Sequence, residues 1–149
     1  HMEETPLHYA MKYKEMHDAY NIKRQEAIKI LVEHGACVNS TTTNLETPLH
    51  YAFKNHDRDE HGTGTEFRLQ LARTLLELGA DPNAQNKLGI TPFYVLVSTP
   101  CTDNKHAIGF LMLYKRGANP NLKTQEGYTP LHRAVCARQL RWVQLLVSH

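Results

Sequence analysis

Two short phrases recur along this chain and constrain its fold more than any other feature. One is Thr-Pro-Leu-His or a close variant, and the other begins with Gly-Ala and ends with Asn. The first phrase starts at Thr5, Thr47, Thr91 and Thr129, and the second at Gly35, Gly79 and Gly117. A chain with internal repeats of this length is expected to form an array of similar units, each packed against its neighbours.

Each phrase has a definite conformational meaning. Thr caps the N-terminus of a helix, Pro is tolerated in the first turn, and Leu begins the buried face. Gly after an apolar stretch ends a helix in the left-handed conformation, and the later Asn can bond backbone groups of the turn that follows. Two stretches with helical spacing lie between a start and a stop, such as residues 48–53 and 67–78. Each unit is therefore predicted to be a helix pair closed by a loop.

The sequence resembles the ankyrin repeat family, whose Thr-Pro-Leu-His-x-Ala signature occurs intact at residues 5–10, 47–52 and 129–134. The resemblance covers nearly the whole chain. It implies an all-α solenoid of stacked antiparallel helix pairs with projecting hairpin-like loops. We expect one domain over residues 1–149, with units of about 3–44, 45–86, 87–124 and 125–149. The last unit is incomplete, so Val147 is expected to face a polar cap or a further repeat of a longer protein.

The period of the repeat departs from that family. The steps between successive Thr residues are 42, 44 and 38 residues, against about 33 in the family. The distance from each capping Gly to the next Thr is constant, so the extra residues lie between the paired helices. We expect residues 14–20 to lengthen the first helix before Asn21, because they are good helix formers. Residues 56–65 are charged and then rich in Gly, which predicts a mobile surface loop.

A second departure lies two residues before the Thr of each unit. Gly89 and Gly127 occupy this position in the third and fourth repeats, but the second repeat has Leu45 and the first has Glu3. If the position requires a positive φ, Leu45 costs on the order of 1 kcal/mol or forces a different turn. The first projecting loop is therefore the least certain part of the predicted fold.

Composition excludes several classes of function. The formal charge of +2 is too small and too dispersed for a surface that binds nucleic acid. The longest apolar runs, residues 94–97 and 109–114, are far shorter than the roughly 20 residues of a membrane-spanning helix. Cys37, Cys101 and Cys136 form no short pair and are odd in number, which favours a reducing compartment. We expect a cytoplasmic or nuclear protein.

The recurring histidines are expected to be structural. His8, His50 and His132 belong to separate helices, and the resemblance implies that each bonds loop backbone between repeats. Tyr94 replaces this His in the third unit, which a shared histidine site would seldom tolerate. Apolar residues at helical spacing are expected to form the core. They are Ala27, Ile28, Ile30, Leu31, Val32, Leu71, Leu75, Leu76, Phe110, Met112, Leu113, Trp142, Val143, Leu145 and Leu146.

No catalytic, metal or cofactor site is predicted. His56 and His61 flank three acidic residues, but two histidines on one loop do not match the four-ligand spacing of a structural zinc site. We interpret that segment as a solvated charged loop. The cysteines lack a neighbouring base and an oxyanion site, so they are interpreted as ordinary thiols rather than nucleophiles.

Function is then expected at the variable positions of the repeat, on the loop tips and the outer faces of the first helices. The predicted partner-binding residues are Lys12, Tyr13, Glu46, Lys54, Lys87, Leu88, Ile90, Ser98, Gln125, Glu126, Tyr128 and Cys136. Tyr13, Leu88, Ile90 and Tyr128 are the expected anchors, because buried aromatic and aliphatic side chains supply most interface energy. An alternative is that Ile90 and Tyr128 only pack against each other along the row of loops.

The sequence thus predicts a non-catalytic, monomeric module that binds a protein partner through its concave face and loop tips, and neither nucleic acid nor a membrane. One alternative is the adaptor or inhibitor part of a larger protein, such as a ubiquitin-ligase substrate receptor or a viral or symbiont effector. A more remote alternative is a metal-dependent module or enzyme that uses the loop from His56 to His61. Partner identity lies beyond the sequence, because one fold serves many functions.

Overall fold

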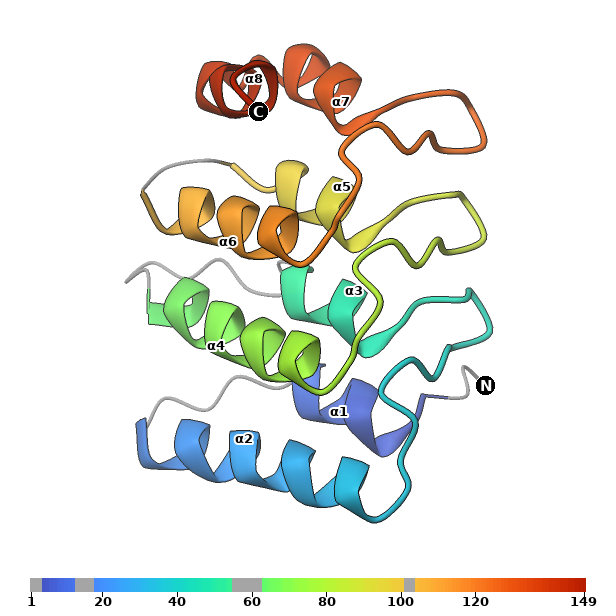
Figure 1. The fold of residues 1–149 in the computed structure, drawn as a ribbon, viewed down its shortest axis with the longest axis vertical. Helices are drawn as coiled ribbons and strands as arrows, with labels where there is room; N and C mark the ends of the chain where they lie inside the picture. The colour runs from blue at the N-terminus through green and yellow to red at the C-terminus, as the bar shows by residue number, and fades with distance from the viewer. Residues whose placement is uncertain (1–3, 13–17, 55–62, 101–103) are drawn as a thin grey trace. The chain divides into compact units, whose positions relative to one another are not determined.

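The computed structural model describes residues 4–12, 18–54, 63–100 and 104–149, and all regular structure in these ranges is helical. The helices are α1 (Pro6–Lys12), α2 (Asp18–Glu33), α3 (Pro48–Phe53), α4 (Thr63–Glu77), α5 (Pro92–Val97), α6 (Asn104–Lys115), α7 (Pro130–Cys136) and α8 (Leu140–Val147) (Figure 1). The predicted all-α class is confirmed, and the expected helix over residues 48–53 matches α3.

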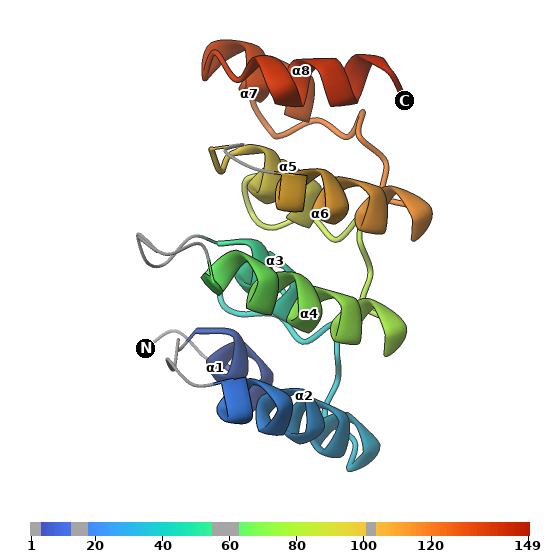
Figure 2. The same cartoon turned by 90° about the vertical axis from the view of Figure 1, so that its left-hand side faces the viewer.

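The chain forms two compact units, which we call unit 1 (His1–Asp81) and unit 2 (Pro82–His149). In unit 1 the pair α1 and α2 stacks on the pair α3 and α4, so that α1 contacts α3 and α2 contacts α4. Figures 1 and 2 both show these two helix pairs stacked on one another. In unit 2, α5 pairs with α6, α7 pairs with α8, and α5 contacts α7. Each unit thus holds two stacked helix pairs.

The Thr-Pro phrase begins a helix in every repeat, as predicted. Helices α1, α3, α5 and α7 all start at the Pro of the phrase. Thr47, Thr91 and Thr129 have extended backbones, and the side chain of Thr91 accepts the N–H of Tyr94 at 3.1 Å. Extended geometry at the N-cap lets the Thr oxygen satisfy a backbone donor that the helix leaves unpaired. Local capping chemistry therefore fixes where each first helix begins.

The Gly-Ala phrase ends the second helix of a pair. Gly35 has a φ of 92°, and Ala36 N donates to Leu31 O at 2.9 Å, which closes the helix end in a left-handed cap. The Asn of the phrase then bonds backbone of the next repeat rather than of its own turn. In unit 1 the side chain of Asn39 donates to Gly79 O at 3.2 Å and accepts from Asp81 N at 2.8 Å. Asn83 makes the same two bonds in unit 2, with Gly117 O and Asn119 N.

The structure corrects where two insertions go. Helix α1 ends at Lys12 and α2 begins at Asp18, so residues 18–20 lengthen the second helix rather than the first. Helix propensity favours helix at these residues but does not say which helix they join. Residues 63–65 also belong to a helix, α4, because a single Gly in a first turn costs only about 1 kcal/mol. Residues 13–17, 55–62 and 101–103 lie outside the described ranges.

Both units have an apolar core that largely matches the predicted one. In unit 1, Ile28, Leu71 and Leu75 are fully buried. In unit 2, Trp142 is fully buried and its indole N–H donates to Thr99 O at 3.0 Å. The prediction was wrong for Ile30, which is 54% exposed, and for Ala27, which is also exposed. Residues two apart point to opposite sides of a helix, so burial of Ile28 turns Ile30 outward.

Candidate functional site

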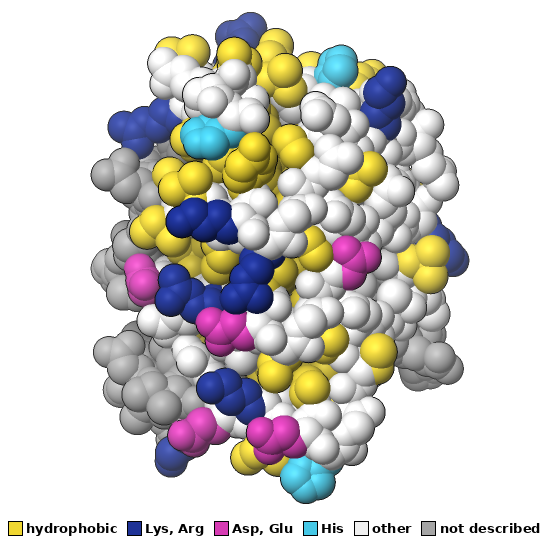
Figure 3. Space-filling view, viewed as in Figure 1, with side chains coloured by type: hydrophobic (Ala, Val, Ile, Leu, Met, Phe, Trp, Pro, Cys, Tyr) yellow, Lys and Arg dark blue, Asp and Glu magenta, His cyan; other side chains and the backbone are white. Residues whose placement is uncertain are grey.

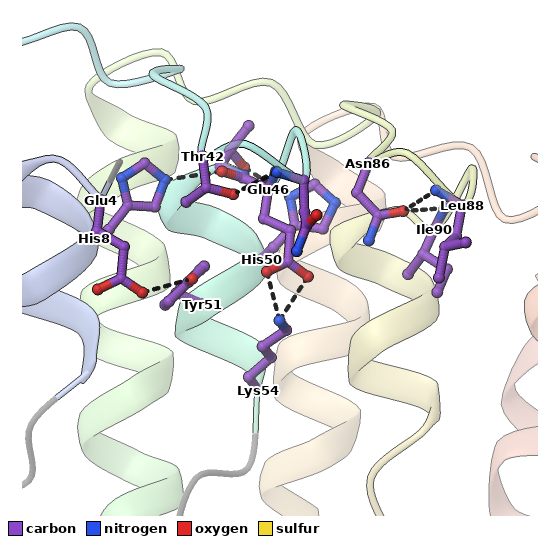
Figure 4. A network of polar contacts seen from close by, with 12 residues as sticks. Glu4, His8, Thr42, Glu46, His50, Tyr51, Lys54, Asn86, Leu88 and Ile90 are labelled. Atoms are coloured by element: carbon purple, nitrogen blue, oxygen red, sulfur yellow. Dashed lines mark hydrogen bonds and ion pairs between the residues drawn. The ribbon is translucent and has the colours of Figure 1, made fainter. Parts of the chain in front are cut away.

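Three loop tips share one backbone design. They are Thr42–Glu46, Asn86–Ile90 and Thr124–Tyr128, each directly before the Thr of the next helix. In each tip the first N–H donates to the last carbonyl, at 3.0, 3.0 and 2.8 Å. The side-chain oxygen of the first residue accepts the N–H of the last one, at 3.3, 3.0 and 3.1 Å. Figure 4 shows this bond in the first two tips. A short polar side chain thus closes each tip from within.

The fourth residue of each tip has a positive φ. Leu45 has a φ of 58°, whereas Gly89 and Gly127 have 73° and 86°. Leu45 therefore keeps the same turn as the glycines and carries backbone strain of about 1 kcal/mol. Its side chain is 45% exposed, so packing offsets little of that strain.

The last two tips, both in unit 2, are joined directly. Gln125 N donates to Leu88 O at 2.9 Å, and the side chain of Gln85 donates to Lys123 O at 3.0 Å. A Cβ atom on Gly89 would lie 2.9 Å from Gln125 N. The close approach of the two tips therefore requires Gly at position 89, for space as well as for its φ.

The joined tips and the start of α5 enclose a hollow of about 160 Å³. Its lining residues are Leu88, Ile90, Tyr94, Thr124, Gln125, Glu126 and Tyr128, and we call this site the unit 2 hollow. Five of the twelve predicted partner-binding residues are among them. Leu88 and Tyr128 are 61% and 46% exposed, while Ile90 is half-buried. Residues far apart in the sequence thus meet around one partly apolar depression.

Tyr94 lies where the other repeats have His, and this difference shapes the hollow. In the first repeat, His8 Nδ1 accepts the N–H of Thr5 at 3.2 Å, so the proton is on Nε2, which donates to Glu46 O at 2.8 Å. That bond confirms the expected structural role of this His. The hydroxyl of Tyr94 has no hydrogen-bond partner among the described residues. Burial raises the pKa of Tyr94, although the positive charge of Arg133 opposes the shift.

The rim of the hollow is polar and carries one formal charge. Gln125 and Glu126 are exposed, and the carboxylate of Glu126 has no hydrogen bond or ion pair with the described residues. The ring of Tyr128 meets that of His132 edge to face, with centroids 6.1 Å apart. Arg133 Nε donates to Ser98 Oγ at 3.3 Å, which directs this cation toward Ser98.

The aligned positions in unit 1 have different chemistry. We call the residue before each Thr the pre-Thr position and the residue eight places later its partner position. Glu46 and Lys54 occupy them in the second repeat, with Lys54 Nζ 2.6 Å from Glu46 Oε2 (Figure 4). Glu4 and Lys12 form the same pair in the first repeat, at 3.2 Å. In unit 2 the corresponding residues are Ile90 with Ser98 and Tyr128 with Cys136.

Tyr51 ties the unit 1 pairs together. Its hydroxyl donates to Glu4 Oε1 at 2.9 Å, and Lys54 Nζ lies 5.0 Å from its ring centroid. Burial and the bond to Glu4 raise the pKa of Tyr51. Burial alone would raise the pKa of Glu4, but its bonds from Tyr51 and Lys12 outweigh burial and lower that pKa. The acidic and basic groups here satisfy one another.

The remaining predicted contact residues are spread more widely. Glu46 is expected on the exterior but is only 8% exposed, because its carboxylate turns inward to Lys54. Lys12 and Lys54 are half-buried, while Lys87 and Cys136 are exposed. Tyr13, Cys101 and the segment from His56 to His61 lie outside the described residues. The structure therefore gathers five of the eight unit 2 candidates around the hollow and places Lys12, Glu46 and Lys54 of unit 1 in ion pairs.

Two lining residues were not among the predicted contacts. The sequence signal for Tyr94 was the break in the series of histidines, which was interpreted only as an argument against a histidine site. Thr124 aligns with Thr42 and Asn86 as the first residue of a tip, but this alignment needs the backbone bonds to be recognised. Both were missed because the sequence does not show that two tips join.

Two other kinds of feature are absent from the described part of the chain. No group of three or more His, Cys, Asp or Glu side chains there is placed to hold a metal ion. None of the helices in that part is long and apolar enough to cross a membrane.

Comparisons with known proteins give the family. A family model described as ankyrin repeats in three copies matches residues 1–86 and 61–149. The chain is 35% identical over 114 residues to human Rabankyrin-5 and 38% identical over 72 residues to a putative ankyrin repeat protein of Rickettsia felis. It is also 29% identical over 124 residues to ankyrin repeat protein OPG189 of Variola virus.

These matches cover much of this chain but little of its relatives. They span 73%, 48% and 81% of the chain, and 9%, 32% and 20% of the three relatives in the same order. The family match over the whole chain agrees with the repeated Thr-Pro starts, the Gly-capped ends and the stacked helix pairs of each unit. The chain therefore belongs to the ankyrin repeat family, whose repeats are generally protein–protein interaction modules.

Proposed function

We propose that this chain is a non-catalytic module that binds a protein partner, with the unit 2 hollow as its principal contact. The observation that carries the proposal is the convergence of Leu88, Ile90 and Tyr128 around one hollow on joined loop tips. An aromatic and two aliphatic side chains at a partly exposed depression are typical anchors of an interface. The backbone bonds between the tips hold these side chains in place, which lowers the entropic cost of binding.

The unit 1 pairs support this choice of site by contrast. Lys54 and Glu46 neutralise each other, so a partner would have to compete with an existing ion pair there. Ile90 and Tyr128 carry no formal charge, so binding at these two side chains does not require an ion pair of their own to break. We therefore assign unit 1 a smaller share of the partner contact than the sequence prediction gave it.

The proposal is tested by site-specific photo-crosslinking in cell extract. A photoreactive phenylalanine analogue replaces Tyr128 in one variant and Tyr114 in a matched control, since Tyr114 is also an exposed tyrosine of unit 2. We expect a protein crosslink at position 128 that is absent at position 114. The double substitution Ile90→Glu with Ser98→Lys, which copies the unit 1 pair, should remove it.

Equal crosslinking at positions 128 and 114, or a crosslink at 128 that survives the double substitution, would contradict the proposal. Circular dichroism on each variant checks that helix content is unchanged. A Glu and Lys pair occupies the aligned positions of two other repeats, so the double variant is expected to fold.

A finer proposal makes the chain the recognition part of a larger adaptor or inhibitor. The matched relatives, which include bacterial and viral ankyrin repeat proteins, are several times longer than the matched segment. The cytoplasmic or nuclear location and the monomeric state remain predictions. Size-exclusion chromatography with light scattering tests the monomeric state.

A further inference from the structure

We propose that the unit 2 hollow takes one bulky apolar side chain of a peptide segment, and that a Lys or Arg next to it in that segment pairs with Glu126. This inference rests on the proposed function and names the class of partner. It follows from the size of the hollow, the chemistry of its walls and the position of its one charge.

The size of the hollow suits a single side chain. Its volume is about 160 Å³, and a cavity of about 150 Å³ in another protein accepts benzene. Pockets for drug-sized ligands and cofactors usually measure about 300–1,000 Å³. A phenyl or branched aliphatic group therefore fits, whereas a nucleotide or comparable metabolite does not.

The walls of the hollow favour an apolar group in a defined orientation. Leu88, Ile90 and the two tyrosine rings supply apolar surface. The hydroxyl of Tyr94, which has no hydrogen-bond partner in the described part of the chain, can bond a polar atom beside that surface. Backbone carbonyls or N–H groups on either side of an inserted side chain are natural partners for that hydroxyl. A peptide provides both the apolar group and the adjacent backbone.

The charge at the hollow sets the preference for a basic neighbour. Glu126 is the sole charged residue of the lining, and its exposed carboxylate has no ion-pair partner among the described residues. Arg133 is held by Ser98. Lys87 lies on one tip and Lys123 directly before the other, and neither lines the hollow. On the face shown in Figure 3, basic and acidic side chains lie next to one another. The local charge of Glu126 therefore decides partner preference more than any wide field does.

The test is a selection of phage-displayed random peptides on the whole chain, followed by binding of a synthetic peptide with the selected sequence. We expect the selected peptides to share a bulky apolar residue next to Lys or Arg. Fluorescence anisotropy then compares the selected peptide with a version in which its basic residue is replaced by Glu. Both peptides are measured on the wild type, Glu126→Gln, Glu126→Lys and Tyr128→Ala.

Each variant has a definite expected result. Glu126→Gln should weaken the basic peptide about 2- to 5-fold, as for an exposed ion pair, and Glu126→Lys should reverse the preference between the two peptides. Tyr128→Ala should weaken both at least about 10-fold, as for loss of an interface anchor. Glu33→Lys is the matched control, because it makes the same change of net charge at an exposed site in unit 1.

Failure of this inference can be told apart from failure of the proposed function. Peptides that lose affinity with Tyr128→Ala but ignore Glu126→Lys would overturn the basic neighbour and leave the hollow as a protein-binding site. Peptides unaffected by Tyr128→Ala, or no enrichment at all, would overturn the peptide-binding hollow. Self-association of the wild type that Leu140→Ser abolishes would place a second copy in the hollow instead, since Leu140 is 68% exposed beside Arg141.

Discussion

Unit 1 and unit 2 share the closed loop tip that precedes each Thr but differ in side-chain chemistry at the pre-Thr and partner positions. Unit 1 places Glu46 against Lys54, an ion pair that is complete within the unit. Unit 2 places Ile90 and Tyr128 there, and a hollow remains beside them. The comparison shows that the repeat fixes where side chains stand, whereas their chemistry decides whether the surface is already satisfied or open to a partner.

The loop tips of the two units also differ, in the residue that holds the positive φ. Leu45 keeps a strained positive φ at an exposed tip, whereas Gly89 relieves the strain and lets the next tip approach. One conformation is thus held at two different costs. The free-energy cost of the turn at Gly89 would rise sharply with any side chain, because backbone atoms of Thr124 and Gln125 already occupy the place of a Cβ atom.

The largest effect is expected when both tips receive the same residue. Gly89→Ala should lower the free energy of unfolding by about 2–4 kcal/mol, since it adds strain at positive φ and pushes Gln125 away. Leu45→Ala should change it by less than about 0.5 kcal/mol, because an exposed side chain is exchanged at an unchanged φ. Urea unfolding followed by circular dichroism measures both. Equal losses would show that the tips are not built differently.

The next largest effect is a difference in stability between substitutions at the partner positions of unit 1 and unit 2. Lys54→Met should lower the free energy of unfolding by about 1–2 kcal/mol, because the largely buried carboxylate of Glu46 loses its nearest cation. Ser98→Ala should change it by less than about 0.5 kcal/mol. Thermal unfolding of the two variants gives the difference. A neutral Lys54→Met would mean that the unit 1 pair contributes no stability.

A smaller effect is expected from making the repeats alike. Tyr94→His should restore the bridge that His8 makes in unit 1, with Nδ1 accepting from Thr91 N–H and Nε2 donating to a loop carbonyl. One such bond adds about 0.5–1.5 kcal/mol to the free energy of unfolding. The same change should reduce crosslinking at position 128, because it alters the hollow. Greater stability with unchanged crosslinking would remove Tyr94 from the proposed contact.

The smallest expected effect is on the dependence of stability on pH in the acidic range. The pKa of Glu4 is lowered below its usual 4.5 in the folded chain, so its contribution to stability is full above that pH and is lost as pH falls through the folded value. Tyr51→Phe removes one donor to Glu4 and should move that pKa back up, which weakens the acid dependence. NMR titration of the Glu4 carboxyl checks the direction. The aligned positions of unit 2 hold Ile90 and Tyr128, neither of which carries a carboxyl group.

The sequence was sufficient where local chemistry decides. Thr-Pro starts and Gly-Ala ends gave the helix boundaries at α3 and the left-handed caps, because capping depends on a few adjacent residues. The positive φ at Leu45 was also inferable, from its alignment with Gly89 and Gly127. Assignment of residues 18–20 failed because propensity does not tell which of two helices a segment extends.

The hollow was predictable only in part. Leu88, Ile90 and Tyr128 stood out as apolar residues at variable positions, and the structure brings them together. Their proximity depends on the backbone hydrogen bond from Gln125 N to Leu88 O. This bond joins residues 37 apart in the sequence, so no local pattern shows it. The burial of Glu46 was missed for a similar reason, since its pairing with Lys54 requires the tip to fold back on the helix.

The asparagine bridges make each loop a reporter of how repeats separate. The amides of Asp81 in unit 1 and Asn119 in unit 2 belong to exposed loop residues, yet each donates to an asparagine one repeat earlier. Such amides exchange with solvent deuterium only when the bridge opens. Their exchange rates would therefore report how often one repeat separates from the next inside each unit, without any added probe.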